Sequence, residues 1–147
     1  MSTVVTSRDL HHTSYIHIVE DDFALANAMQ LLIQTEGLKT IHHASGEDFL
    51  FHLAQNTPPT AEIVPSCILL DIRLIDMSGL EVFEEITSKY PDLTAPIIFL
   101  TGHGDLHMAV EVMKNGAFDF LTKPFNSERL LQQVHKALKK STKLIEE

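Results

Sequence analysis

The chain has 147 residues and a formal net charge of −9, from 20 acidic residues against 11 lysines and arginines. That length predicts one domain with its own hydrophobic core, and the single cysteine excludes an internal disulfide framework. No apolar run reaches the ~18 residues of a membrane span, the first fourteen residues contain no signal-peptide core, and the acidic charge argues against a broad basic face for nucleic acid. We therefore expect a cytoplasmic protein without a membrane contact.

The first elements expected along the chain are a strand and a helix. Residues 1–14 are expected to form a flexible N-terminal extension. The run from Tyr15 to Val19 is apolar-rich and breaks abruptly into Glu20-Asp21-Asp22, as a buried strand does at the edge of a sheet. From Ala24 to Glu36, apolar residues recur at three- and four-residue spacing, which predicts a helix that ends at Gly37.

The alternation of strand and helix continues along the rest of the chain. A long surface loop is expected at 55–65, where three prolines occur. Because the strand runs are almost solidly apolar and helices separate them, the pattern predicts a parallel sheet buried on both faces, an open doubly wound α/β domain. The further strands are expected at 38–43, 67–70, 96–100 and 118–121, and the further helices at 45–53, from about 79, at 105–115 and at 127–140 or beyond.

The chain ends in a basic segment attached to an acidic body. The first 127 residues hold 17 acidic and 6 basic residues, whereas the last twenty hold five basic and three acidic ones. A few lysines on a helix usually form a solvated face, so we do not expect this segment to bind nucleic acid. The domain body is placed at 15–140, and 141–147 is interpreted as a helix extension or the start of a linker.

The ends of the expected strands carry the polar residues. In doubly wound sheets, ligands bind beyond the carboxyl ends of the strands. Glu20 and Asp21 follow the first strand, Asp71 the third, Thr101 the fourth and Lys123 the fifth. Carboxylates this close repel one another unless a cation lies among them, and such oxygen ligands suit Mg²⁺ or Mn²⁺. With a lysine and a hydroxyl beside them, the site is suited to phosphoryl transfer onto an aspartate.

Several separated motifs resemble the receiver domain of two-component response regulators, and the FixJ-type subgroup in particular. They are IVEDD, ILLDIRLIDMSGLEVF and PIIFLTGHGDLHMAVEVMKNGAFDFLTKPF, and the likeness covers about residues 15–140. The resemblance implies a five-stranded parallel sheet with helices on both faces and the flavodoxin/CheY-like strand order 2-1-3-4-5. It also implies a signalling switch that promotes its own phosphorylation and dephosphorylation, and not an enzyme acting on external substrates.

The resemblance assigns a phosphoacceptor and a metal site. Asp71 would accept a phosphoryl group from a sensor histidine kinase. Asp21 would bind Mg²⁺ directly and Glu20 through water, with Asp71 itself and the main-chain carbonyl of Arg73 completing the protein ligands.

The resemblance also assigns a switch. Thr101 and Lys123 would contact the phosphoryl group, and Phe120 would occupy the aromatic switch position. On phosphorylation, Thr101 would move towards the phosphate and Phe120 would turn inward. This would remodel the face made by the fourth helix and the fifth strand, through which members of the family form homodimers. The Lys123-Pro124 bond is expected to be cis.

Simpler interpretations of these residues stay open at this point. Asp22 is expected to cap a helix, Asp71 alone would be typical of a turn, and Phe120 could be a core residue. The nine histidines do not by themselves predict a metal site, since the segment from His103 to His107 lacks the His-Glu-x-x-His pattern. Cys67, within an apolar run, is expected to be buried and inert.

Other classes of function fit less well. A nucleotide- or flavin-binding module would need a Gly- or Ser/Thr-rich loop after the first strand, where this chain has three acids. A phosphohydrolase with an Asp nucleophile typically has a second carboxylate two residues after it, where this chain has Arg73. A metal-dependent enzyme remains an alternative. Relatives of the FixJ type continue into a helix-turn-helix domain that binds DNA, so either an output domain for transcription is missing here or the receiver acts alone through protein contacts.

Overall fold

Five parallel strands form one sheet in the order β2-β1-β3-β4-β5 in the computed structural model, which describes residues 14–56 and 64–147. The doubly wound sheet and its strand order are therefore as predicted. The expected extension at 1–14, apart from Ser14, and most of the expected loop at 55–65 lie outside the described residues. The strands are β1 (Tyr15–Val19), β2 (Lys39–His43), β3 (Ser66–Asp71), β4 (Ile97–Thr101) and β5 (Asp119–Thr122).

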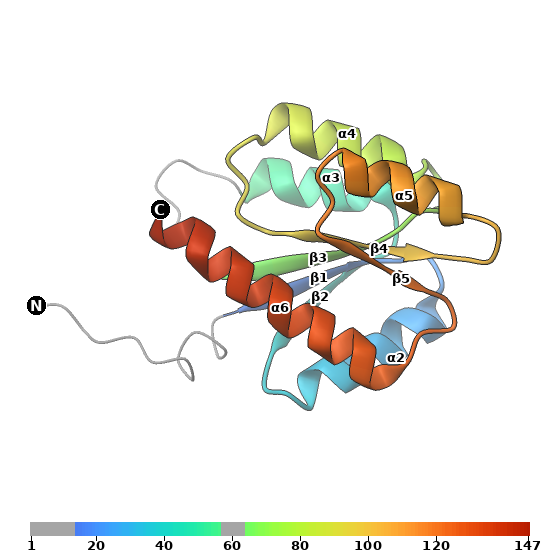
Figure 1. Ribbon diagram of the computed structural model, residues 1–147, viewed down its shortest axis with the longest axis horizontal. Helices are drawn as coiled ribbons and strands as arrows, with labels where there is room; N and C mark the ends of the chain where they lie inside the picture. The colour runs from blue at the N-terminus through green and yellow to red at the C-terminus, as the bar shows by residue number, and fades with distance from the viewer. Residues whose placement is uncertain (1–13, 57–63) are drawn as a thin grey trace, which may run out of the picture.

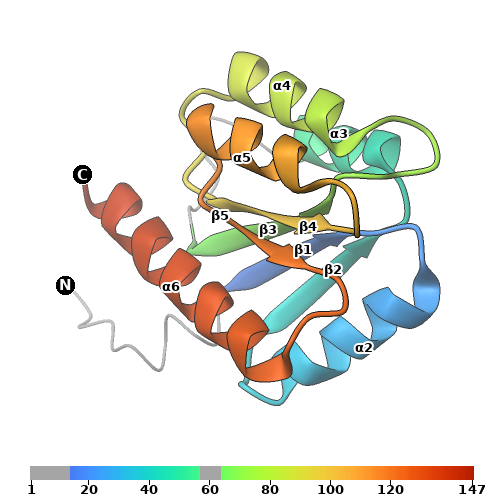
Figure 2. The same ribbon diagram turned by 45° about the vertical axis from the view of Figure 1, so that its right-hand side comes forward.

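Helices cover both faces of the sheet. Helices α3, α4 and α5 lie on one face and α2 and α6 on the other (Figures 1 and 2). Within the described ranges, no helix combines the length and the apolarity that crossing a membrane requires. The helices are α2 (Phe23–Gln34), α3 (Gly46–Gln55), α4 (Gly79–Lys89), α5 (Leu106–Lys114) and α6 (Ser127–Glu146).

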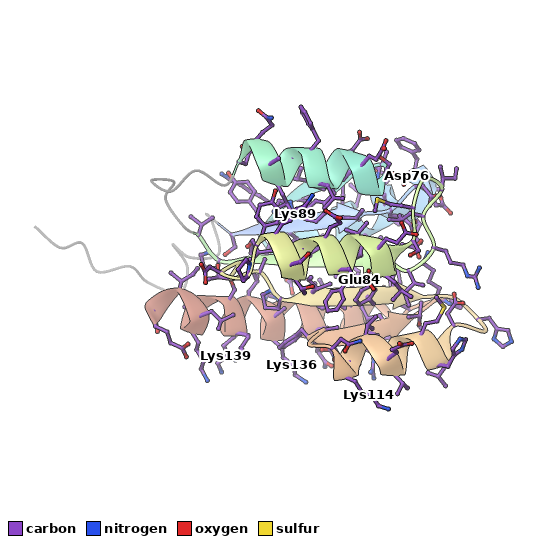
Figure 3. All side chains as sticks on the ribbon, turned by 90° about the horizontal axis from the view of Figure 1, so that it is seen from above. Asp76, Glu84, Lys89, Lys114, Lys136 and Lys139 are labelled. Atoms are coloured by element: carbon purple, nitrogen blue, oxygen red, sulfur yellow. The ribbon has the colours of Figure 1, made fainter. Side chains whose placement is uncertain are left out.

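The C-terminal helix runs unbroken past the position where the sequence placed the end of the domain body. Ser141 of α6 is fully buried, and its Oγ accepts a hydrogen bond of 3.0 Å from the backbone N–H of Ser66 at the start of β3. The basic side chains of α6 lie on its outer side, where Lys136 and Lys139 point away from the sheet (Figure 3). Helix α6 therefore packs on the body along its apolar side and keeps its lysines in solvent.

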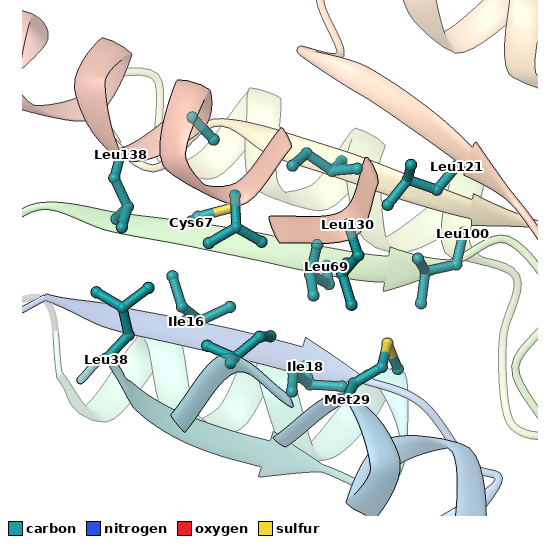
Figure 4. Close-up of a cluster of buried hydrophobic side chains, with 14 of the residues drawn as sticks. Ile16, Ile18, Met29, Leu38, Cys67, Leu69, Leu100, Leu121, Leu130 and Leu138 are labelled. Atoms are coloured by element: carbon teal, nitrogen blue, oxygen red, sulfur yellow. The ribbon is translucent and has the colours of Figure 1, made fainter. Parts of the chain in front are cut away.

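The sheet separates two hydrophobic cores, which explains why its strand sequences are solidly apolar. Successive residues of a strand point to opposite faces. In β3, Cys67 and Leu69 enter the core beneath α2 and α6 (Figure 4), while Ile68 and Leu70 enter the core beneath α3, α4 and α5. Cys67 is buried, as expected, and burial raises the pKa of its thiol well above the ordinary value, so it stays protonated.

Most helices begin at a residue whose type favours an N-cap and whose side chain makes the capping hydrogen bond. The carboxylate of Asp22 accepts from the N–H of Leu25, and the hydroxyl of Ser45 accepts from the N–H of Asp48, each at 3.1 Å. Asp22 is thus a cap, as expected. Helix α2 ends at Gln34, two residues earlier than predicted, because the chain turns towards β2 through Gly37, whose φ of +77° is a glycine conformation.

Gly79 lets helix α4 start directly against the end of β3. Its N–H donates a 2.7 Å hydrogen bond to the carbonyl of Ile72. A Cβ atom at this position would lie 2.2 Å from the carbonyl oxygen of Asp71, a distance that backbone atoms cannot tolerate. The position of Asp71 therefore depends on a close backbone contact that only glycine permits.

Replacing Gly79 with alanine should lower the free energy of unfolding by about 1–3 kcal/mol, because α4 must move away from β3 to admit the methyl group. The matched control is Gly102→Ala, whose Cβ would meet its nearest neighbour at an ordinary 3.7 Å. Urea unfolding of both variants measures the difference. Equal stability of the two variants would contradict the close contact.

Candidate functional site

The carboxyl ends of β1 and β3 bring three carboxylates together. Carboxylate oxygens of Glu20, Asp21 and Asp71 all lie within 4.8 Å of one another. Glu20 and Asp71 are buried and Asp21 is half-buried. Because β1 and β3 are neighbouring parallel strands, residues that follow Val19 and Leu70 in register necessarily meet at one edge.

Lys123, which directly follows β5, joins two of these carboxylates. Its Nζ donates to Glu20 Oε1 at 2.8 Å and to Asp71 Oδ2 at 2.6 Å. The backbone N–H of Lys123 donates to the carbonyl of Thr101 at 2.7 Å, which holds the start of this loop on β4. The Lys123-Pro124 bond is cis, as expected. Burial lowers the pKa of Lys123, but hydrogen bonds to the two carboxylates outweigh burial and the net shift is upward.

The pKa of Glu20 shows that three carboxylates so close together are electrostatically unfavourable. Burial, followed by the close approach of Asp71, raises the pKa of Glu20 to about 8 even though Lys123 acts in the opposite direction. One ammonium group is therefore not enough to balance three neighbouring carboxylates. Hard oxygen donors with one half-buried member, open to water, fit a Mg²⁺ or Mn²⁺ ion, which would supply the missing positive charge.

Asp71 is held by donors on both of its oxygens. Oδ1 accepts a 3.0 Å hydrogen bond from the backbone N–H of Arg73, while Oδ2 accepts from Lys123. This fixes the plane of the carboxylate at the end of a buried strand. An aspartate presented in this way, beside a cation site and a lysine, is suited to attack a phosphoryl group.

The two residues expected to switch lie on neighbouring strands. Thr101 ends β4, is buried, and its hydroxyl donates to the carbonyl of Leu121 in β5 at 3.3 Å. The hydroxyl is therefore engaged with the β5 backbone. Phe120 of β5 is half-buried and packs against the core beneath α3, α4 and α5, so it contributes to that core in the present conformation.

The loop between β3 and α4 is tied down by Arg73, through a pair that sequence reasoning missed. The guanidinium group donates to Asp105 through Nε, at 2.9 and 3.1 Å, and through Nη2 at 2.7 Å. Asp105 is 1% exposed, and its hydrogen bonds with Arg73 lower the pKa of its carboxyl group. The sequence showed Asp105 only as the start of a helix. Its side chain makes no cap hydrogen bond in α5, because Arg73 occupies both oxygens.

A second tie holds the same loop to the start of α3. Asp76 accepts hydrogen bonds from the N–H groups of Gly46 at 3.1 Å and Glu47 at 2.8 Å, and Figure 3 shows it beside that end of α3. A carboxylate at a helix N-terminus is favourable both as an acceptor and as a charge. Asp76 therefore helps to keep the segment after Asp71 in place.

Asp76→Ala should lower the free energy of unfolding by about 1 kcal/mol near pH 7. Slight burial raises the pKa of Asp76, but the N–H donors of Glu47 and Gly46 outweigh it and the net shift is downward. The folded state therefore favours the ionised form, and this stabilisation is present above pH ~4 and is lost as the pH falls through the lowered folded pKa. Urea unfolding at several pH values measures the difference.

The matched control for Asp76→Ala is Asp92→Ala, which removes an exposed carboxylate in the turn after α4. We expect it to change stability by less than about 0.5 kcal/mol at each pH. A loss of stability in Asp76→Ala that stays constant down to about pH 3 would exclude a charge contribution from this side chain.

Other candidate residues lie away from the acidic cluster. His103 and His107 are exposed on the loop before α5 and in its first turn. By contrast, the described residues contain a histidine cluster that the sequence did not predict, formed by His17, His43 and His52.

The fold and the site define a class of protein. A parallel sheet in the order 2-1-3-4-5, with carboxylates and a lysine at its carboxyl edge, is the architecture of CheY-like domains. The sequence profile described as "Response regulator receiver domain" matches residues 16–135. The chain belongs to the response regulator receiver domain family.

Individual relatives agree with this assignment. The chain is 40% identical over 126 residues to the response regulator protein TmoT of Ectopseudomonas mendocina, covering 86% of this chain and 53% of TmoT. It is 33% identical over 126 residues to the transcriptional regulatory protein FixJ of Azorhizobium caulinodans, covering 86% and 56%. The chain thus spans about half the length of the curated relatives it matches.

A solved structure agrees in fold. The signal receiver domain of a putative Luxo repressor protein from Vibrio parahaemolyticus superimposes with a TM-score of 0.77 and 31% sequence identity. The aligned region covers 90% of this chain and 97% of that one. The described body therefore corresponds to nearly the whole of a receiver domain.

Proposed function

We propose that this receiver accepts a phosphoryl group from a sensor histidine kinase onto Asp71 and answers with a changed surface. The observation that carries the proposal is the position of Lys123, whose ammonium group bridges Asp71 and the buried Glu20. In this role the domain is a switch that promotes its own phosphorylation and dephosphorylation. It would not turn over an external substrate.

The chemistry follows from the neighbours of Asp71. One of its carboxylate oxygens attacks the phosphorus, and the bond from phosphorus to the donor breaks. Lys123, which hydrogen-bonds that carboxylate, is within reach of the negative charge that spreads over the phosphoryl oxygens. Mg²⁺ held by Asp21, Asp71, the carbonyl of Arg73 and, through water, Glu20 would neutralise further charge.

The response begins at Thr101. To hydrogen-bond a phosphoryl oxygen, its hydroxyl must leave the carbonyl of Leu121. That movement vacates space beside β5, and Phe120, which is only half-buried, turns inward to occupy it. The change reaches the surface formed by β5 and α5.

Helix α5 offers an apolar surface for homodimerisation. Leu106, Val110 and Met113 recur at helical spacing and are 59%, 47% and 37% exposed. These side chains form a stripe of the kind that a second copy of the domain covers. Because the FixJ relative is a transcriptional regulatory protein, we propose that dimerisation serves transcription, with DNA contacted by an output domain outside this segment.

The acceptor is tested with acetyl phosphate in Mg²⁺, by intact-mass measurement. The parent chain should gain the mass of one phosphoryl group, and the gain should disappear when Mg²⁺ is omitted. Asp71→Asn should gain nothing, because the amide nitrogen or oxygen cannot replace the carboxylate nucleophile. The control Asp92→Asn removes an exposed carboxylate and should be labelled like the parent. Labelling of Asp71→Asn would place the acceptor elsewhere.

Lys123 is tested separately, because it is proposed to contact the phosphoryl group once that group is on Asp71 as well as to assist its transfer. Lys123→Ala should fold, but its phosphorylated form should not dimerise, since nothing then ties the phosphoryl group to the loop after β5. Sedimentation velocity of both proteins at matched phosphorylation measures this. Equal dimerisation of the two phosphorylated proteins would exclude the role.

A metal-dependent phosphohydrolase at the same edge predicts a different result. It would release many equivalents of phosphate from a small phosphoester such as p-nitrophenyl phosphate. The switch instead predicts no more than one phosphoryl group on Asp71 at a time, and no steady release of p-nitrophenol from p-nitrophenyl phosphate. Intact-mass measurement after acetyl phosphate and the phosphate-release assay with p-nitrophenyl phosphate, run on one preparation, separate the two functions.

A further inference from the structure

Three histidines from separate elements meet beneath helix α3. They are His17 on β1, His43 at the end of β2 and His52 on α3. One ring nitrogen from each lies within 4.8 Å of the other two. His17 Nδ1 and His43 Nε2 are 3.1 Å apart, and the ring centroid of His52 lies 4.9 Å from that of His43 and 5.5 Å from that of His17.

The fold dictates this meeting. Strands β1 and β2 pair in parallel with His17 opposite Ile41 and Val19 opposite His43, so the two histidines are diagonal neighbours on one face of the sheet. Helix α3 crosses that face with Phe49 buried beneath it, and the Phe49 ring contacts both histidines, at centroid distances of 5.6 and 4.9 Å. One helical turn further on, His52 completes the cluster.

One histidine of the cluster is buried and the other two are partly exposed. His43 is 4% exposed, whereas His17 and His52 are half-buried and reach solvent. Burial, with the mutual repulsion of the rings as a second cause, lowers the pKa of His17 to about 4 and that of His43 to about 3. Both rings are therefore neutral at pH 7 and each keeps one nitrogen lone pair. Neutral imidazole is the form of histidine that binds metals.

The spacing fits one tetrahedral ion. Two nitrogens bound to the same Zn²⁺ at about 2.0–2.1 Å lie roughly 3.4 Å apart. His17 Nδ1 and His43 Nε2 already lie close to that separation, and the remaining nitrogen is within 4.8 Å. Closing the set requires the half-buried His52 ring, in the last turn of α3, to rotate towards the other two.

We propose that His17, His43 and His52 bind one Zn²⁺ ion, with water in the fourth position, at a site distinct from the carboxylate cluster. Three imidazoles suit Zn²⁺, or the chemically similar Cu²⁺ and Ni²⁺, whereas Mg²⁺ prefers the oxygen ligands of Glu20 and Asp71. The ion cross-links β1, β2 and α3. It takes the place of the hydrogen bond that holds His17 Nδ1 and His43 Nε2 3.1 Å apart in the structure.

The test is a ZnCl₂ titration of chelator-treated protein at pH 7 in excess Mg²⁺, measured by calorimetry and by competition with a chromophoric zinc chelator. The parent should bind one Zn²⁺ per chain and melt at a higher temperature with it. His52→Ala should weaken binding by more than about tenfold and lose the thermal shift. His52→Gln, checked by circular dichroism, covers the case in which the alanine variant is unfolded.

Two controls separate this site from other sources of zinc affinity. His103→Ala removes an exposed imidazole from the loop before α5, and a double change of His11 and His12 to alanine removes the histidines outside the described residues. Both should bind like the parent, and so should Asp71→Asn. Equal zinc affinity in folded His52→Gln and the parent, or loss of binding in either histidine control, would overturn the proposal.

Discussion

The contact between Lys123 and the two buried carboxylates organises the functional end of this domain. It joins the loop after β5 to the end of β1 at 2.8 Å and to the end of β3 at 2.6 Å. Removing charges from water is costly, so such a contact persists only where each partner is needed to balance the others. The raised pKa of Glu20 shows that the balance is incomplete without a further cation. The charge and the oxygen donors of this site therefore suit a further cation.

The rest of the fold serves to bring those side chains to one edge. Four of the five strands are held between two cores. Their register places Glu20 level with Asp71, and Asp71 level with Leu100, the residue before Thr101, where the apolar runs end. Gly79 then lets α4 start against Asp71 without a gap. The loop between them is held at both sides, by Arg73 on Asp105 and by Asp76 on α3. The segment around Asp71 is thus held by backbone contact and by charged side chains together.

Much of this was predictable from sequence, because it depends on periodicity. Solid apolar runs predict buried parallel strands, and the residue after each run must then lie at the carboxyl edge, which places Glu20, Asp71 and Lys123. What sequence could not predict depends on side-chain direction between distant elements. Arg73 hydrogen-bonds to Asp105, 32 residues further along the chain, and the hydroxyl of Thr101 donates to the backbone of β5.

The histidine cluster was missed for a similar reason. Its members are 26 and 9 residues apart and share no motif. Only the register of β1 on β2 and the rotation of α3 decide that their rings meet.

The ion pair between Arg73 and Asp105 links the loop after β3 directly to the start of α5. Arg73 lies two residues after Asp71 and shares a hydrogen bond with it, and Asp105 directly precedes α5, whose Leu106 is exposed. One ion pair therefore holds the segment after Asp71 and the start of α5 together. The hydrogen bond of Thr101 to β5 is buried, whereas this ion pair lies at the surface, with an arginine side chain that is 75% exposed. A partner that bound the exposed part of that guanidinium group would therefore contact the ion pair that holds the loop after β3 to the start of α5.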